Sequence, residues 1–345
     1  MWVALSCALT ILSMLSPALC FRPLEEWTDQ SPHRTILVEV APNVRLEVLD
    51  WGGRGRPLVL LTGSGLTAHI YDEIAPKLTD CCHVYAITRR GFGASSHPDS
   101  GYDDQRLADD VLRVIDALKL QRPVLVGHSM AGGELTTLGH QHSQRVGGLV
   151  YLDALADPRD NPAGDPAFQA LLPRIPKEVN QKEPPDYSSF TAYRAWQVRT
   201  GVGAFPEAEL RQLFELKPDG TMGSYKASTG AINQAIGQGQ KKRDYSGITV
   251  PVLALVDLPR ARRISELRAD EYHPKNDEER ATFEAMGKLL GAYSDRWVAN
   301  LKGHVPGARV VNLDGAGHYL FLTRQEVALR EIHAFVAGPV RALTR

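Results

Sequence analysis

The residues best suited to chemistry in this chain lie in the segment 127–132, which reads GHSMAG and carries Ser129 near its centre. An apolar run, Pro123 to Val126, precedes the segment, and a helix-like stretch beginning at Glu134 follows it. A serine on a tight turn between a strand and a helix holds its Oγ above the sheet edge, where the new helix offers backbone N–H groups to an anion. The pattern therefore predicts that Ser129 is a nucleophile.

A serine hydroxyl needs a base near neutral pH, and His318 is the strongest candidate among the 11 histidines. It ends the glycine-rich segment 314–318 (DGAGH), between an expected strand and an expected helix. The C-terminal ends of parallel strands meet at one edge of a sheet, so we expect His318 to lie beside Ser129.

The other histidines receive different interpretations. We interpret His128 as a packing residue and His69 as a candidate for lining the pocket. His140 and His142 lie at a polar helix end, and no carboxylate or cysteine spacing makes them a metal site. The sequence predicts no bound metal and no cofactor.

The histidine in turn needs a carboxylate to fix its tautomer, and two aspartates follow expected strands at the same edge. Asp153 directly follows the expected strand that comes, in sequence, after the helix behind Ser129. Asp257 directly follows the expected strand that ends at Val256. The first position is favoured because Asp257 precedes a basic run that would compete for its charge (Arg260, Arg262 and Arg263). Asp257 stays the alternative acid, with three lesser candidates elsewhere (Asp157, Asp160 and Asp314).

Acyl transfer also needs donors for the developing oxyanion. Met130 offers its backbone N–H from the first turn of the helix, and we expect the second donor to be the N–H of Ser64 in the loop 62–66 (TGSGL). This glycine-rich loop lacks both G-x-G-x-x-G and a Lys-Ser/Thr ending, which argues against a nucleotide site.

Composition limits the classes of function. The chain has 345 residues, of which 43% are hydrophobic, enough for a full-sized core. Its 39 Lys and Arg residues nearly cancel 40 Asp and Glu residues, and without a basic block the chain has no electrostatic footprint for nucleic acid.

Residues 1–20 are apolar and uncharged, which predicts a signal peptide with cleavage before Phe21 and a secreted or periplasmic protein. An uncleaved membrane anchor is the alternative, because about 20 apolar residues can span a bilayer. No later segment is long and apolar enough to do so. Removal of the leader leaves Cys81 and Cys82, which we interpret as two partly buried thiols, with redox switching as the alternative.

Strand and helix signals alternate from residue 35 onward, which predicts an α/β fold with a mostly parallel, doubly wound sheet. Thr35–Val40 and Val44–Leu49 read as an antiparallel pair, and Ile70–Leu78 and Leu107–Leu120 read as helices. The alternation breaks after Asp153 and resumes at Val250. We therefore predict a core of residues 21–153 and 247–345 and an inserted cap of residues 154–246, with helices near residues 193–198 and 207–216.

These pieces together resemble the α/β-hydrolase superfamily over residues 35–336. The resemblance rests on the segment 127–132, the loop 61–65, the segment 90–95 (RGFGAS) and the segment 315–318 (GAGH). The strand ending at Val256 lacks the Gly-x-x-Asp turn that carries the acid in most members, and some branches place the acid after the preceding strand, where this chain has Asp153. Dehalogenases and epoxide hydrolases of the superfamily use an aspartate nucleophile where this chain has Ser129.

The resemblance implies a serine hydrolase with a helical cap that acts on a small carboxylic ester or lactone. Carbon–carbon bond hydrolysis, perhydrolysis and aminopeptidase action are the enzymatic alternatives, and a non-catalytic ligand-binding protein is the alternative from another class. Aromatic residues of the cap either wall an apolar pocket or pack the cap onto the core (Tyr187, Phe190, Tyr193, Trp196, Phe205 and Phe214). The sequence does not specify an oligomeric state.

Overall fold

The computed structural model describes residues 27–338 apart from residues 181–182, 220, 227 and 260–271. The predicted signal peptide and the basic run after Asp257 therefore lie outside the described residues. Among the residues that are described, no helix combines the length and the apolar character needed to cross a membrane.

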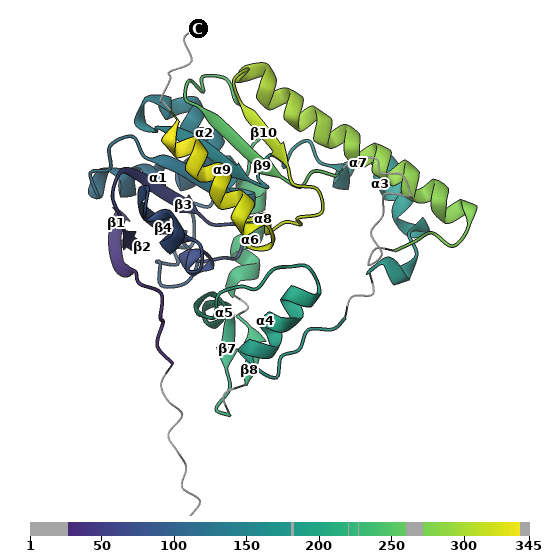
Figure 1. Cartoon of the computed structure of the whole chain (residues 1–345), viewed down its shortest axis with the longest axis horizontal. Helices are drawn as coiled ribbons and strands as arrows, with labels where there is room; N and C mark the ends of the chain where they lie inside the picture. Colours follow the sequence, from purple (N-terminus) through teal and green to yellow (C-terminus); the bar gives the residue numbers. More distant parts are fainter. Residues whose placement is uncertain (1–26, 181–182, 220, 227, 260–271, 339–345) are drawn as a thin grey trace, which may run out of the picture.

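An eight-stranded sheet with the order β1-β2-β4-β3-β5-β6-β9-β10 forms the centre of the chain (Figure 1). The first two strands, β1 (Arg34–Ala41) and β2 (Val44–Gly52), are antiparallel to each other, and β2 is antiparallel to β4. The other neighbouring strands are parallel, which confirms the predicted fold class. In chain order, these strands are β3 (Arg56–Leu61), β4 (Cys82–Ile87), β5 (Val124–His128), β6 (Gly148–Leu152), β9 (Val252–Val256) and β10 (Arg309–Asn312).

Helices cover both faces because the central strands are apolar on both sides. In β3, Leu58 and Leu60 pack on one face, and Val59 and Leu61 pack on the other. The first face carries η1 (Ala68–Tyr71), η2 (Ala75–Leu78), α8 (Leu320–Thr323) and α9 (Gln325–Ala337). The second carries α1 (Asp104–Ala117), α2 (Gly132–His142) and α7 (Asp277–His304).

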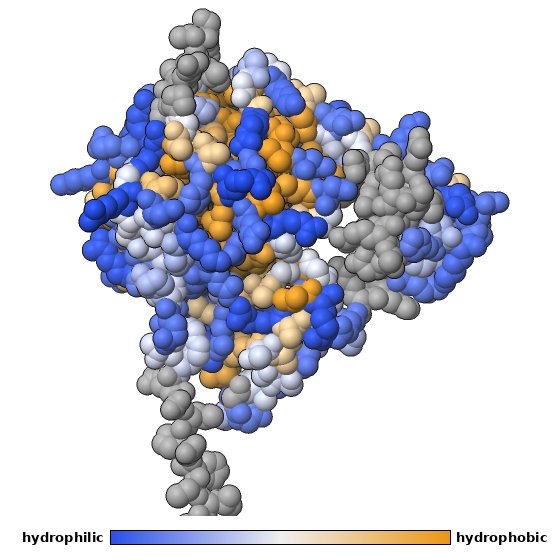
Figure 2. Space-filling model, in the orientation of Figure 1, coloured by the Kyte–Doolittle hydropathy of each residue, from blue (hydrophilic) through white to orange (hydrophobic). Residues whose placement is uncertain are grey.

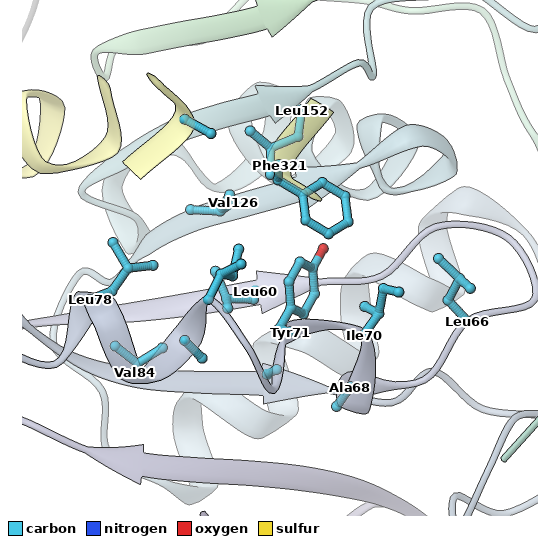
Figure 3. Packing of buried hydrophobic residues seen from close by; sticks show 14 of the residues in the cluster. Leu60, Leu66, Ala68, Ile70, Tyr71, Leu78, Val84, Val126, Leu152 and Phe321 are labelled. Atoms are coloured by element: carbon cyan, nitrogen blue, oxygen red, sulfur yellow. The ribbon is translucent and has the colours of Figure 1, made fainter. Parts of the chain in front are cut away.

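On the first face, Tyr71 connects η1 to the sheet. Its hydroxyl donates to the carbonyl oxygen of Leu61 at 2.8 Å, and its ring points toward Phe321, 5.4 Å away between centroids (Figure 3). Figure 2 shows hydrophobic side chains near α9, β9 and β10, with hydrophilic ones over much of the surrounding surface.

The prediction of one helix over Ile70–Leu78 is wrong. The chain instead forms the two short 3-10 helices η1 and η2. Pro76 is the physical reason, because a proline has no N–H to donate to the carbonyl of Asp72 and its ring would collide with that carbonyl in a continuous α-helix.

The insertion between β6 and β9 consists of two parts (Figure 1). In the part that follows β6 in sequence, α3 (Pro166–Leu171) lies beside α7. In the next part, four elements lie together below the sheet in the view of Figure 1: α4 (Phe190–Arg199), α5 (Glu207–Leu213) and a hairpin of β7 (Phe214–Leu216) and β8 (Met222–Tyr225). A further helix, α6 (Ser228–Gly239), leads back toward β9. The predicted helix over residues 207–216 ends early because Phe214 pairs with Tyr225 in the hairpin. The cap boundaries stay a prediction.

Candidate active site

Ser129 occupies the turn between β5 and α2. Its backbone has a φ of 56°, a left-handed conformation that is uncommon for residues other than glycine. Gly132 permits this sharp turn, because a Cβ atom at that position would lie 2.2 Å from the carbonyl oxygen of Ala154. The sequence therefore builds a strained turn that presents Ser129 at the C-terminal edge of the sheet.

His318 and Asp153 complete a chain of hydrogen bonds with Ser129. The Nε2 atom of His318 lies 2.8 Å from Oγ of Ser129, and its Nδ1 atom lies 2.6 Å from Oδ2 of Asp153. With Nδ1–H donating to the carboxylate, Nε2 is free to accept the serine proton. The structure thus brings together the three residues that the sequence singled out as nucleophile, base and favoured acid.

Asp257, the alternative acid, makes other contacts. Its carboxylate accepts hydrogen bonds from the backbone N–H groups of Gly315 and Gly317, at 3.1 and 2.7 Å. Both glycines belong to the loop that carries His318. The described contacts therefore place Asp257 behind the backbone of that loop, while Asp153 contacts the imidazole.

The predicted oxyanion loop lies against Ser129. A Cβ atom added to Gly63 would lie 3.3 Å from Cβ of Ser129 and 2.6 Å from Nδ1 of His128, so only glycine fits between these side chains. Ser64 follows Gly63 and Met130 follows Ser129, which places the two expected N–H donors on adjoining turns. Their role as oxyanion donors stays a prediction.

Arg89 holds the predicted oxyanion loop through two backbone carbonyl groups. Its guanidinium donates to the carbonyl oxygens of Thr62 and Gly63, at 2.9 and 3.3 Å, and forms a two-pronged ion pair with Glu134 of α2. The side chains of Arg89 and Glu134 are each only 5% exposed. One buried ion pair therefore connects the loop at residues 62–63 to the helix that follows Ser129.

His128 has a more specific place than the packing role expected from the sequence. It is buried, and its Nε2–H donates to the carbonyl oxygen of His318 at 2.9 Å. Burial lowers the pKa of His128 to about 3, and the neighbouring His318 acts in the same direction. His128 is therefore a neutral residue that holds the backbone of His318.

The insertion approaches the site at two points. The Oγ atom of Ser64 donates to Oδ1 of Asn233 in α6 at 2.7 Å, and the ring of Phe205 contacts Tyr319 edge-on at 4.8 Å between centroids. Phe190, Phe205 and Phe214 are buried within the main core, which favours the packing interpretation for these three aromatic residues. Tyr187 is exposed and stacks on Tyr193.

Sequence reasoning did not find Arg89 or Asn233. Arg89 directly precedes the segment 90–95, on which the family resemblance partly rests, and this position is the one sequence signal that points to it. Asn233 lies in an insertion helix without a strong apolar period, and no local signal in the sequence connects it to Ser64. His69, which the sequence offered as a pocket-lining candidate, instead faces Asp72 and Asp29.

Comparison with known sequences decides the family. A sequence model of the alpha/beta hydrolase family matches residues 58–331. The chain belongs to this family. Among curated relatives, this α/β hydrolase is 32% identical over 140 residues to a non-heme chloroperoxidase of Kitasatospora aureofaciens, covering 38% of this chain and 50% of that protein. It is 34% identical over 117 residues to 2-hydroxymuconate semialdehyde hydrolase of Pseudomonas sp. CF600, covering 33% of this chain and 41% of that protein.

The chain spans about half the length, or less, of these two relatives. Solved structures resemble the α/β hydrolase over more of its length. An E-2-(acetamidomethylene)succinate hydrolase aligns with a TM-score of 0.61 and 20% identity, over 89% of this chain and 100% of the other. An esterase from Exiguobacterium antarcticum aligns with a TM-score of 0.55 and 20% identity, over 88% of this chain and 99% of the other. At these identities the likeness shows the fold alone.

Proposed function

We propose that this α/β hydrolase is a serine hydrolase that cleaves a small carboxylic ester or lactone through an acyl-enzyme on Ser129. The observation that carries the proposal is the continuous hydrogen-bond chain from Asp153 through His318 to Ser129. This arrangement activates a hydroxyl for attack on a carbonyl carbon.

In the proposed reaction, Nε2 of His318 takes the proton of Ser129 as Oγ attacks the substrate carbonyl. The N–H groups of Ser64 and Met130 stabilise the oxyanion that forms. His318 then protonates the departing alkoxide, which leaves an ester on Ser129. Water attacks this ester with His318 again accepting a proton, and the carboxylic acid departs as Ser129 regains its hydrogen.

Replacement of Ser129 by alanine tests the assignment. We expect the purified full chain to hydrolyse small aryl esters and to become covalently labelled by a fluorophosphonate, with loss of fluoride from phosphorus. Ser129→Ala should lose labelling and at least about 1,000-fold in kcat, with an unchanged circular dichroism spectrum. Retention of most activity would exclude Ser129 as the nucleophile, and an unlabelled wild-type protein would favour a ligand-binding role.

A panel of short esters, long esters and lactones then narrows the substrate class. If the protein hydrolyses esters or lactones as proposed, it should turn over at least one of these three substrate classes. Comparison of kcat/KM across the panel distinguishes them, because acyl length and ring closure change the fit beside Ser64 and Asn233 while the attack on the carbonyl stays the same.

Perhydrolysis, in which hydrogen peroxide is a substrate, is a second candidate, and one curated relative is named a non-heme chloroperoxidase. In this reaction hydrogen peroxide replaces water, attacks the acyl-enzyme and departs as a peracid while Ser129 regains its hydrogen. Formation of peracid from acetate ester and peroxide, lost in Ser129→Ala, would support this activity. Ester hydrolysis without any peracid would exclude it.

Secretion is also part of the proposal, because residues 1–20 have the apolar character of a signal peptide. Expression of the full chain in a host with a secretory pathway should yield a mature protein whose first residue is Phe21. A membrane-bound product that keeps Met1 would instead support the anchor.

A further inference from the structure

A second group of polar side chains lies away from Ser129, where the chain that precedes β1 meets η1. It contains Asp29 and His33 from the N-terminal arm (residues 27–33), His69 from η1, and Asp72, which directly follows η1. One ligand-type atom from each residue lies within 4.8 Å of the other three. The hydrolytic site uses none of these side chains.

Four nitrogen–oxygen separations within this His/Asp cluster are close to those expected between ligands of a single small cation. Nε2 of His33 lies 3.2 Å from Oδ2 of Asp29 and 3.4 Å from Oδ1 of Asp72. Nδ1 of His69 lies 3.2 Å from Oδ2 of Asp29 and 3.0 Å from Oδ2 of Asp72. Tetrahedral Zn²⁺ with ligands at about 2.0–2.1 Å separates neighbouring ligand atoms by about 3.3–3.4 Å.

The burial of Asp72 is independent evidence that a cation binds in the cluster. The side chain of Asp72 is only 5% exposed, and its Oδ1 atom has no hydrogen-bond partner among the described residues. A buried carboxylate oxygen without a partner is costly. Because Oδ1 faces His33 within the cluster, a cation coordinated there would satisfy it.

The charges also favour a divalent cation. As metal ligands, two neutral imidazoles and two carboxylates would carry a net charge of −2, which one divalent ion would neutralise. The buried carboxylate of Glu47 lies 3.9 Å from Nε2 of His69 and adds negative charge behind the cluster. A carboxylate behind a ligating histidine is a frequent outer partner at metal sites.

The local structure holds the four side chains in place. Side chains three residues apart eclipse on a 3-10 helix, so His69 and Asp72 project together from η1. The residues between them, Ile70 and Tyr71, point into the core (Figure 3). On the arm, Oδ1 of Asp29 accepts the N–H of Ser31 at 2.9 Å, which leaves Oδ2 facing both histidines.

We propose that Asp29, His33, His69 and Asp72 bind one Zn²⁺ ion in a structural site. Two imidazoles and two carboxylates suit zinc, and four protein ligands leave no coordination position open for a substrate. The ion fastens the N-terminal arm to η1, which directly follows the predicted oxyanion loop. The sequence does not reveal this site because its ligands come from two separated pairs, D-x3-H and H-x2-D.

Zinc binding by tag-free chain tests the proposal. After removal of metal with a chelator, we expect the wild type to bind about one equivalent of Zn²⁺ in equilibrium dialysis and to unfold at a higher temperature with zinc than without it. Asp29→Asn and His33→Ala should each weaken zinc binding at least about ten-fold and remove the thermal shift. Co²⁺ in the wild type should give the visible absorption of a tetrahedral complex.

Two control variants locate the ion. Cys81→Ser removes a ligand of another group of potential ligands (Asp80, Cys81 and His333), and Ser129→Ala alters the hydrolytic site. Both should bind zinc as the wild type does. A wild type that binds no zinc, or Asp29→Asn and His33→Ala variants with unchanged affinity, would overturn the proposal, as would loss of binding in Cys81→Ser. Because Asp29 is on the arm and 25% exposed, Asp29→Asn decides the question if His33→Ala does not fold.

Discussion

The backbone N–H of Asp257 donates to Oδ1 of Asp153 at 3.1 Å, while the other carboxylate oxygen of Asp153 contacts His318. The two aspartates that compete in the sequence for the role of acid are therefore neighbours in the structure. Asp153 contacts the imidazole, and Asp257 holds both Asp153 and the loop that carries His318. This division of contacts gives the two residues different expected effects on the reaction.

We expect Asp153→Asn to lower kcat/KM for an aryl ester by about 10,000-fold, because an amide no longer stabilises the correct tautomer and charge of His318. Asp257→Asn should cost about ten-fold, since it loosens the backbone of the loop without removing the carboxylate behind the imidazole. Steady-state kinetics of both variants, with melting temperatures as a check on folding, measure the difference. The reverse ranking would move the role of acid to Asp257.

Arg89 and Arg90 offer a matched pair of buried arginines. Arg89 pairs with Glu134 and holds the carbonyls of the oxyanion loop, whereas Arg90 pairs with Asp110. Arg89→Met leaves the carboxylate of Glu134 buried without its partner, which costs about 3–5 kcal/mol of stability. It should also lower kcat, because the loop loses its support.

Arg90→Met is the control for this experiment. It should cost less stability, because Arg106 still contacts Asp110 at 2.5 Å, and it should leave kcat near the wild-type value. Urea unfolding and ester kinetics measure both quantities. Equal losses of kcat in the two variants would show that Arg89 acts only through general stability.

The sequence predicted the parts of the site that depend on local pattern. The strands β5 and β6 are apolar runs because both of their faces are buried, and the residues that follow them, Ser129 and Asp153, could be placed at one sheet edge from that fact alone. The glycines before His318 similarly marked a turn after β10.

The missing parts depend on contacts between distant segments. His128 and His318 are 190 residues apart in sequence, and no local period indicates that one holds the carbonyl of the other. The single helix predicted over Ile70–Leu78 is absent because Pro76 interrupts it, so the chain forms η1 and η2 instead. Propensity and periodicity identify elements, whereas the supporting contacts are set by tertiary packing.

His128 gives the stability of the fold a pH dependence with a definite sign. Its pKa is lowered from 6.5 to about 3 in the folded state, so the unfolded chain takes up a proton first as the pH falls. The contribution of His128 is therefore complete above pH 6.5 and declines toward pH 3, by at most about 1.4 kcal/mol per pH unit. His128→Gln should be less stable at pH 7.5 but should lose stability more slowly between pH 6.5 and 4.5.

Unfolding free energies from urea titrations across this pH range measure the effect. Glutamine can donate to the carbonyl of His318 but does not titrate, so the difference between the two proteins isolates the imidazole. Parallel pH profiles for the wild type and His128→Gln would contradict a lowered pKa at this position.

Gly63 lies close to both Ser129 and His128. In Gly63→Ala the new methyl group would lie 2.6 Å from Nδ1 of His128, whose ring is buried, and 3.3 Å from Cβ of Ser129. The loop must move away from Ser129, which carries the N–H of Ser64 out of reach of the oxyanion. We expect a loss of about 100-fold or more in kcat, comparable to removal of one oxyanion donor.

Gly237→Ala in α6 is the matched control, because nothing lies within 4 Å of its added methyl group. It should keep full activity and gain about 0.5–1 kcal/mol of stability. Near-normal kcat in Gly63→Ala would show that the loop does not bind the oxyanion.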